Sequence, residues 1–294
     1  MKKFTLLMAL MVFSLSLIGQ TVKKDFKVSG FEGVDAGGVF TIELIKGSDE
    51  GVVIETENTD IIDYIKVYVN GKTLFLSLDT SKIPEKLKEK KLKTIKATVN
   101  IKELTSLNIS GVVKLTSQST FTPEKFEAKI SGASSVGELN VNAKSSRIVV
   151  SGASVLNMRG KVETASYEVS GAAKATLEQQ IGGLKLSGSG AVKVVFTGNI
   201  EFAEISLTGA VNTHFKGSGA KKLMLEMTGA SMFNAFEFPV NEMDVKLAGV
   251  SNASLNVVTT LSAEATGGSN ISYKGTPQIK KMDISSISSL KKIN

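Results

Sequence analysis

The chain has 294 residues, of which 42% are hydrophobic and 21% are charged, so it is long and apolar enough to bury a substantial core. It contains no cysteine, which excludes a disulfide framework and cysteine-ligated metal sites. The formal net charge is +7, but tryptophan is absent and basic and aromatic residues are not interleaved, so we expect no nucleic-acid partner.

The first 20 residues have the composition of a secretory signal peptide. Residues 1–3 form a basic head, residues 4–18 an uncharged stretch rich in Leu and Met, and Gly19-Gln20 a polar exit. A membrane-spanning helix needs about 20 apolar residues, so a cleaved signal is a better interpretation than an anchor. We predict that the mature chain is exported to the periplasm, the outer cell surface or the medium, and that it has no transmembrane span.

Residues 21–106 are expected to form several strands but to lack the repeat found further on. Alternation of apolar and polar residues predicts strands at 40–44 and 52–56, and a hairpin at 66–76 with Asn70-Gly71 as its two-residue turn. Another strand is predicted at 94–101. We interpret this segment as an N-terminal cap that belongs to the same body as the rest and covers the first repeat unit.

A basic run occupies residues 82–93 and contains six lysines. We expect this run to be a solvated loop or a single helical turn on the outside of the protein. The alternative is that it binds acidic polymers, such as acidic glycans, or anionic membrane surfaces.

The last two-thirds of the chain carry the tripeptide Ser/Thr-Gly-Ala, or a close variant, at regular intervals. Successive glycines are separated by 21, 20, 19, 19, 19, 20, 20 and 18 residues. A fixed period of this length indicates a repeat architecture, in which each unit packs on its neighbours. The predicted structural-turn residues are Gly111, Gly132, Gly152, Gly171, Gly190, Gly209, Gly229, Gly249 and Gly267.

Apolar residues recur two and four positions before each glycine, and four and, less regularly, six positions after it. A period of two is the signature of β-strands, so each unit is predicted to contain a strand, the glycine turn, a second strand and a second turn. The fifth unit contains Ser187-Gly188-Ser189-Gly190, which we interpret as two extra residues, with upstream positions counted from Gly188. A tenth, degenerate unit is expected at 282–286, where Ser replaces Gly, as a terminal cap.

Two arrangements suit such units, a parallel β-helix and a meander of hairpins. The repeat region lacks the Asn-Gly and Asp-Gly pairs of tight hairpins, and equivalent residues stay alike from unit to unit, as in-register stacking requires. We therefore predict an all-β fold. Residues 107–290 are expected to form a single-stranded parallel β-helix, or β-solenoid, with coils of about 20 residues.

The position three residues before each glycine is expected to face solvent. In adjacent coils this would place Glu168 beside Lys185, and Lys246 between Glu226 and Glu264. Such alternation indicates charge pairing across strands rather than a binding stripe of one sign.

The Ser-Gly-Ala turns behind a signal peptide, together with the opening segment 31–40 (FEGVDAGGVF), resemble the bacterial family called putative auto-transporter adhesin, head GIN domain. This family is common in Bacteroidota, and the likeness extends from about Phe26 to Ser289. The resemblance implies a β-helix that carries the label adhesin by analogy. It implies no catalytic, cofactor-binding or metal-binding residues.

The distribution of acidic residues argues against catalysis. Parallel β-helices host polysaccharide lyases and hydrolases, and glycoside hydrolysis usually needs two placed carboxylates. Here no Asp occurs between Asp79 and Asp244, and the glutamates are dispersed. His214 is the only histidine and is expected to point outward, so we predict no metal site and no cofactor.

A row of hydroxyl residues immediately precedes the glycines, from Ser110 to Thr266. Regular Thr arrays on β-helices bind ice, so a ligand platform is one interpretation. We favour a structural interpretation, because a row that is one residue wide and lies at a corner is typical of side chains that form hydrogen bonds with turn amides.

We therefore expect an exported, non-enzymatic β-solenoid of the cell envelope that acts as an adhesin or as a structural or binding protein. Glycans or envelope proteins are the expected partners. Two alternatives stay open. One is a carbohydrate-active β-helix enzyme, and the other is a periplasmic binding or assembly factor that uses the basic run.

Overall fold

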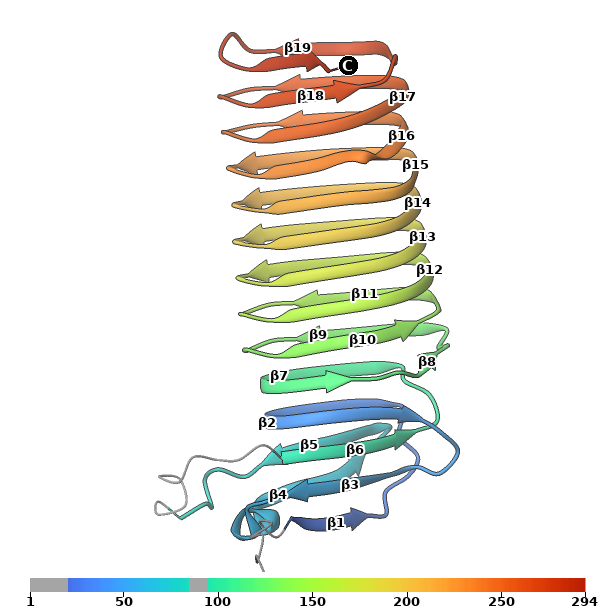
Figure 1. The fold of residues 1–294 in the computed structure, drawn as a ribbon, viewed down its shortest axis with the longest axis vertical. Helices are drawn as coiled ribbons and strands as arrows, with labels where there is room; N and C mark the ends of the chain where they lie inside the picture. Colours follow the sequence, from blue (N-terminus) through green and yellow to red (C-terminus); the bar gives the residue numbers. More distant parts are fainter. Residues whose placement is uncertain (1–20, 85–94, 294) are drawn as a thin grey trace, which may run out of the picture.

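A computed structural model describes residues 21–84 and 95–293. They form one elongated β-solenoid, in which the chain winds in stacked coils from the cap at one end to β20 at the other (Figure 1). The predicted all-β parallel solenoid is confirmed, with about 10 turns and coils of about 19 residues. The predicted signal peptide, and most of the basic run 82–93, lie outside the described residues.

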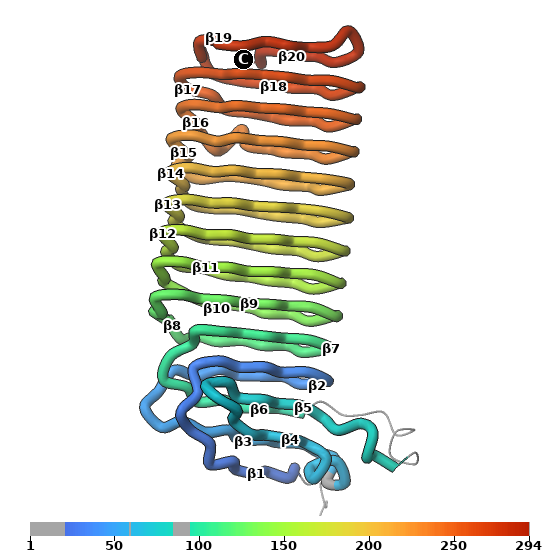
Figure 2. The backbone as a smooth tube through the Cα atoms, turned by 180° about the vertical axis from the view of Figure 1, so that it is seen from behind, coloured from blue at the N-terminus to red at the C-terminus, as the bar shows by residue number. Residues whose placement is uncertain are grey.

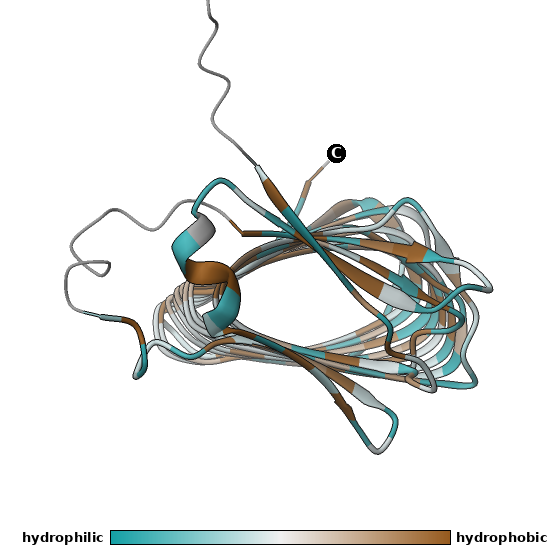
Figure 3. Ribbon diagram, turned by 90° about the horizontal axis from the view of Figure 1, so that it is seen from below, coloured by the Kyte–Doolittle hydropathy of each residue, from teal (hydrophilic) through white to brown (hydrophobic). Residues whose placement is uncertain are grey.

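Short elements that do not follow the repeat close the N-terminal end. β1 pairs antiparallel with β3, β3 pairs antiparallel with β6, and β4 and β5 form a hairpin. Figure 3 views this end and shows the cap strands and the 3-10 helix η1 lying across the mouth of the stack. The bounds are β1 (Val22–Phe26), β3 (Gly51–Thr56), η1 (Thr59–Tyr64), β4 (Ile65–Asn70), β5 (Thr73–Leu78) and β6 (Ile95–Ile101).

The predicted hairpin is confirmed, but its turn lies one residue further along. Asn70 pairs with Thr73, so the two loop residues are Gly71 and Lys72 rather than Asn70 and Gly71. Gly71 has a φ of +58°, and because glycine adopts positive φ without steric cost, it takes the first loop position.

The first coil of the solenoid is β2 (Gly33–Lys46), which lies within the segment where no repeat was expected. β2 pairs in parallel with β7 (Ser106–Thr116), and Gly38 lies beside Gly111 in this register. Residues 47–72 leave the stack and form β3, η1 and β4 of the cap, whereas β5 and β6 pair in parallel with the other edge of β2 and lie beneath it (Figure 2). The expectation that residues 21–106 lack the repeat is therefore wrong for β2, because the coils of β2 and β7 are adjacent in space but not in sequence.

From β7 onward, each coil stacks in parallel on the one before. Over much of the stack a residue lies beside the residue 19 positions later, as Val155 lies beside Lys174. The remaining bounds are β8 (Thr120–Phe121), β9 (Lys125–Ile130), β10 (Ser135–Val141), β11 (Ala143–Val150), β12 (Val155–Gly171), β13 (Lys174–Gly190), β14 (Lys193–Gly209), β15 (Asn212–Gly229), β16 (Met232–Leu247), β17 (Asn252–Ala265), β18 (Asn270–Lys274), β19 (Gln278–Ile284) and β20 (Ser289–Lys292).

The repeat glycines stack on one another along one corner of the solenoid. From Gly111 to Gly267 their φ angles lie between +71° and +101°, in the left-handed region. A Cβ atom added to any of them would lie 2.4 to 3.1 Å from the carbonyl oxygen of the glycine in the preceding coil. Only glycine tolerates both this backbone and this close approach, which accounts for the regular spacing in the sequence.

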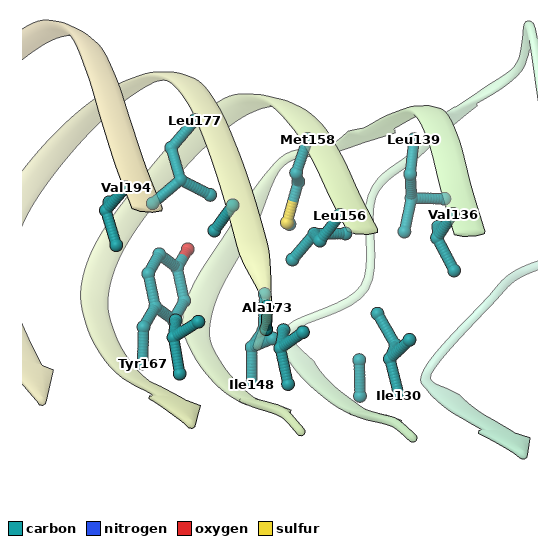
Figure 4. Close-up of a cluster of buried hydrophobic side chains, with 14 of the residues drawn as sticks. Ile130, Val136, Leu139, Ile148, Leu156, Met158, Tyr167, Ala173, Leu177 and Val194 are labelled. Carbon is teal, nitrogen blue, oxygen red and sulfur yellow. The ribbon is translucent and has the colours of Figure 1, made fainter. Parts of the chain in front are cut away.

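A single continuous core fills the interior of the stack. The side chains two and four positions before the glycines, and four positions after them, are almost completely buried. Figure 4 shows Ile130, Ile148 and Tyr167 from one side of the solenoid facing Leu156 and Met158 from the other. These rows match the inward positions predicted from the period of two.

A second row of hydroxyls, which the sequence analysis did not single out, strengthens the glycine corner. These serines lie two positions after the repeat turn and donate hydrogen bonds of 2.9 to 3.3 Å to the carbonyl oxygen of a glycine in the preceding coil. The row comprises Ser134, Ser154, Ser231, Ser251, Ser269 and Ser288. Buried apolar residues, such as Val192 and Val211, occupy the position in other coils.

The predicted insertion in the fifth unit is wrong. Gly188 pairs with Val169 in the coil before and with Leu207 in the coil after, so it occupies the inward position two residues before Gly190. Methyl carbons of Leu207 and Val211 lie 3.1 Å from where a Cβ of Gly188 would stand, and they fill the space of the missing side chain.

This register also corrects one predicted charge pair, since Glu168 lies beside Ser187 and not beside Lys185. The other predicted alternation is confirmed. Lys246 lies between Glu226 and Glu264, with its Nζ atom 3.8 Å from Glu226 Oε1. The tenth unit is also present, because β19 continues the stack in parallel on β17.

Candidate binding surface

The described carboxylates are dispersed over the outer faces, and many of them form ion pairs. Glu178 lies 3.0 Å from Arg159, and Glu201 lies 3.2 Å from Lys221. No group of three or more His, Cys, Asp or Glu side chains within residues 21–84 and 95–293 is arranged to hold a metal ion. Pairing with a cation stabilises the ionised carboxylate, whereas a general acid needs a raised pKa.

An acidic recess of about 640 Å³ lies between the cap and the first coils. Its four glutamates are each paired with a lysine, at distances of 2.6 to 3.1 Å: Glu32, Glu103, Glu124 and Glu127. Burial opposes ionisation of Glu103, but hydrogen bonds from Lys46 and from two backbone N–H groups outweigh it and hold the pKa of that carboxyl below its usual value. The recess therefore offers neither an unpaired anion cluster nor a proton donor.

A shallow groove of about 540 Å³ continues from this recess along the second corner of the coils, from Thr122 to Glu201. The ion pair between Glu124 and Lys144, 2.6 Å long, crosses its lower end. The hydrogen bond from Lys144 holds the pKa of Glu124 below its usual value. The charged side chains in this part of the groove therefore pair with each other, so they are not available to bind a charged ligand.

His214 and the hydroxyl row lie where the sequence placed them. His214 is half-buried on the outer side, between the buried side chains of Thr213 and Phe215. In the hydroxyl row, Ser131 donates to the carbonyl oxygen of Ile109 at 3.3 Å, and Thr228 donates to the hydroxyl of Thr208 at 3.2 Å. These bonds join adjacent coils and support a structural use of the row.

Two large apolar side chains are exposed next to each other on one broad face of the solenoid. Phe202, on β14, is 55% exposed, and Met224, on β15, is 43% exposed. Phe202 lies beside Gly183 in the coil before and Lys222 in the coil after. We call this the Phe202 surface, lined by Thr164, Ser166, Gly183, Lys185, Phe202, Glu204, Lys222 and Met224.

The Phe202 surface is hollowed next to the phenyl ring. The recess has a volume of about 460 Å³. Gly183 contributes no side chain, and a Cβ added there would meet no atom within 4 Å. One side of the ring therefore borders open space.

Three charged side chains surround the ring, and Lys185 and Glu204 are register partners in adjacent strands. Within the described residues, Lys185, Glu204 and Lys222 form neither an ion pair nor a side-chain hydrogen bond, although Lys221 and Lys246 on nearby strands do form ion pairs. An exposed aromatic ring beside a recess, with polar side chains around it, is typical of a binding surface.

Sequence reasoning missed the Phe202 surface, although a signal is present. The sequence Glu201-Phe202-Ala203-Glu204 places a large apolar residue at a position where the alternation demands an outward side chain. An apolar residue on the solvent side of a strand is the exception that points to a partner. Its neighbours, however, come from coils 19 or 20 residues away and become visible only with the register.

Fold and surface together define a parallel β-solenoid whose rigid side faces present ordered rows of side chains. The chain belongs to the family described as putative auto-transporter adhesin, head GIN domain, whose model matches residues 30–217 and 174–277. The resemblance inferred from the sequence is thereby confirmed. No curated protein matches the chain.

Several solved structures are similar to this chain at low sequence identity. A putative adhesin from Parabacteroides merdae ATCC 43184 is 17% identical, with a TM-score of 0.50 over 94% of this chain and 98% of its own. A putative adhesin from Parabacteroides distasonis ATCC 8503 is 18% identical, with a TM-score of 0.49 over the same shares. A putative lipid binding protein from the same organism is 18% identical, with a TM-score of 0.47 and the same coverage.

The described part of the chain contains no helix with the length and apolar character needed to cross a membrane.

Proposed function

We propose that this chain is an exported, non-enzymatic β-solenoid adhesin of the cell envelope that binds glycans through the Phe202 surface. Membership of an adhesin family supports the adhesive part. The observation that carries the ligand class is the exposed ring of Phe202 beside the recess at Gly183, with three unpaired charged side chains around it.

The chemistry of this surface suits a pyranose ring. The C–H face of a sugar is apolar and packs against the face of an aromatic ring, so Phe202 supplies the platform, and Met224 extends it. Sugar hydroxyls donate to Glu204 and accept from Lys185 and Lys222. Because the side chains stand on hydrogen-bonded strands, no backbone entropy needs to be lost on binding, and only the charged side chains lose rotamer freedom.

The paired carboxylates support a non-enzymatic role. Glycosidases usually need a carboxyl group with a raised pKa as the general acid, whereas the pKa values of Glu103, Glu124, Glu127 and Glu264 are all lowered by their hydrogen bonds and lysine partners. Release of unsaturated product from uronate polymers by the purified protein would overturn this part of the proposal. An epitope-tagged chain that stays in the cytoplasm would overturn export.

The glycan part is tested with an array of neutral and acidic glycans, followed by titration of the best ligand. Phe202→Ala is expected to weaken binding about tenfold or more, which is about 1.4 kcal/mol, because the stacking platform is lost. The matched control is Tyr68→Ala, which removes an aromatic ring of similar exposure, 48%, from the cap. An array without any bound glycan, or equal affinities of the two variants, would contradict the assignment.

A further inference from the structure

The two ends of the solenoid are closed very differently. At the N-terminal end the cap covers the core, and Ile61 and Ile65 are buried in it. At the C-terminal end, β19 pairs with β17 and β20 pairs with β18, and no other described strand pairs with either. Among the described residues, no strand covers the outer edge of the last coil (Figure 1).

Residues of the last coil that follow the inward pattern are left uncovered. Met282 occupies the same position as Val245 and Ala263 in earlier coils, yet it is 65% exposed, whereas Val245 and Ala263 are buried. Ile279, which lies beside the buried Leu261, is also exposed. Ile287 is 71% exposed, but it follows the turn at a position that faces solvent in earlier coils too, as at Val250, so it lies at the corner next to the uncovered residues. An apolar patch thus terminates the core, where a polar outer face would be expected of a capping repeat.

Lysines surround this apolar end. Residues 278–293 contain four lysines, Lys280, Lys281, Lys291 and Lys292, against one acidic residue, Asp283. Lys281 is paired with Glu264 of the preceding coil. Within the described residues the other three lysines form no ion pair, so their charges are available to a partner.

We propose that this C-terminal end docks on an anionic lipid surface. Met282, Ile279 and Ile287 enter the boundary between headgroups and acyl chains, while Lys280, Lys291 and Lys292 contact the lipid phosphates. Apolar side chains ringed by lysine are the combination that such a surface binds, because burial of the apolar area and charge attraction act together.

The positive charge of this end argues against end-to-end binding of a second copy of the chain. Two such ends facing each other would bring two net-positive clusters together, which repel. Lysines on an exposed edge strand also oppose strand pairing between molecules. Docking by the end would orient the solenoid away from the lipid, and the Phe202 surface, on β14 and β15, would stay accessible on the side.

The test is co-sedimentation with vesicles of phosphatidylcholine alone and of phosphatidylcholine mixed with phosphatidylglycerol. The protein is expected to bind the mixed vesicles at least tenfold more tightly than the neutral ones. The double variant Met282→Glu/Ile287→Glu is expected to lose at least tenfold in affinity for the mixed vesicles. The control is Met232→Glu/Val258→Glu, which changes two exposed apolar residues, 48% and 50% exposed, at other sites in the stack.

The control contains the same residues 1–20 and 82–93 as the end variant, so their contribution to lipid binding cancels in the comparison. Circular dichroism is used to check that both variants keep the strand signal. Equal binding of the end variant and the control would overturn the proposal, and so would failure of the unmodified protein to bind mixed vesicles. A dimer in sedimentation that Met282→Glu abolishes would reassign this end to self-association.

Discussion

Replacing Gly171 with Ala is expected to lower the free energy of unfolding by about 2–4 kcal/mol. Gly171 has a φ of +81°, which costs an L-residue free energy, and its added Cβ would lie 2.7 Å from the carbonyl oxygen of Gly152. That neighbour is backbone in a stacked coil and cannot rotate away. The measurement is chemical denaturation followed by circular dichroism, because the chain has no Trp to report by fluorescence.

Gly183→Ala is the matched control, because it makes the same chemical change in the next coil. Gly183 lies outside the left-handed region, and its added Cβ would meet no atom within 4 Å. The change is expected to leave the free energy of unfolding within about 0.5 kcal/mol of the original value, or to raise it slightly by restricting the unfolded chain. Equal losses at Gly171 and Gly183 would mean that the glycine corner is not what constrains the stack.

Phe215→Ala is expected to cost about 3–5 kcal/mol of unfolding free energy. Phe215 is completely buried, and its ring centroid lies 5.1 Å from that of Phe196, 5.2 Å from that of Phe233 and 5.6 Å from that of Phe238. These rings come from three consecutive coils, so the cavity left by Ala removes contacts that hold the coils together.

The comparison for this prediction is Phe202→Ala, which deletes the same ring from the outside of β14. Since Phe202 is mostly exposed, its loss is expected to change the free energy of unfolding by about 0.5 kcal/mol or less. Denaturation of the two variants under one set of conditions measures the difference. A Phe215 variant as stable as the Phe202 variant would refute the assignment of the aromatic cluster to the core.

The repeat region could be predicted from sequence because local alternation determines which side chains enter the core. Ile148 and Leu156 flank Gly152 at the predicted inward positions and are buried. The first coil could not be predicted in this way. Gly38 stacks on Gly111 although residues 47–105, which form cap elements and the strands beneath β2, separate their coils in the sequence, and a period interrupted at that length has no local signal.

Register errors have a different cause. Gly188 and Gly190 are separated by one residue, and their composition does not show which one occupies the corner. The positive φ of Gly190, and the packing of Leu207 and Val211 against Gly188, decide between them in the folded chain. Counting from Gly188 instead of Gly190 shifts the predicted register by two residues. Because strands alternate with a period of two, the shift left every apolar residue at an inward position, so the predicted core was correct, but the predicted pair of Glu168 with Lys185 was wrong.

The candidate site depends on the same register. Phe202 with Glu204, Met224 with Lys222, and Lys185 come from three adjacent coils, each about one coil length from the next in the sequence, so their proximity follows only from stacking. Whether a charged residue is free or paired also depends on the coil before and after it. For this reason Lys222 and the adjacent Lys221, which is paired with Glu201, cannot be distinguished from the sequence.

The central claim is that the chain winds in register, with one coil stacked on the next. Because the chain has no cysteine, spin labels can be attached to cysteines introduced at chosen positions of one outward row. The label at Asn157 is paired in turn with labels at Asn234, Ser254 and Ser272, which lie four, five and six coils further along.

Double electron–electron resonance is expected to give backbone separations of about 19, 24 and 29 Å, rising by about 4.8 Å per coil. Distances that do not increase in equal steps along this row, or that shorten between Ser254 and Ser272, would contradict the stacked solenoid and the binding surfaces derived from it.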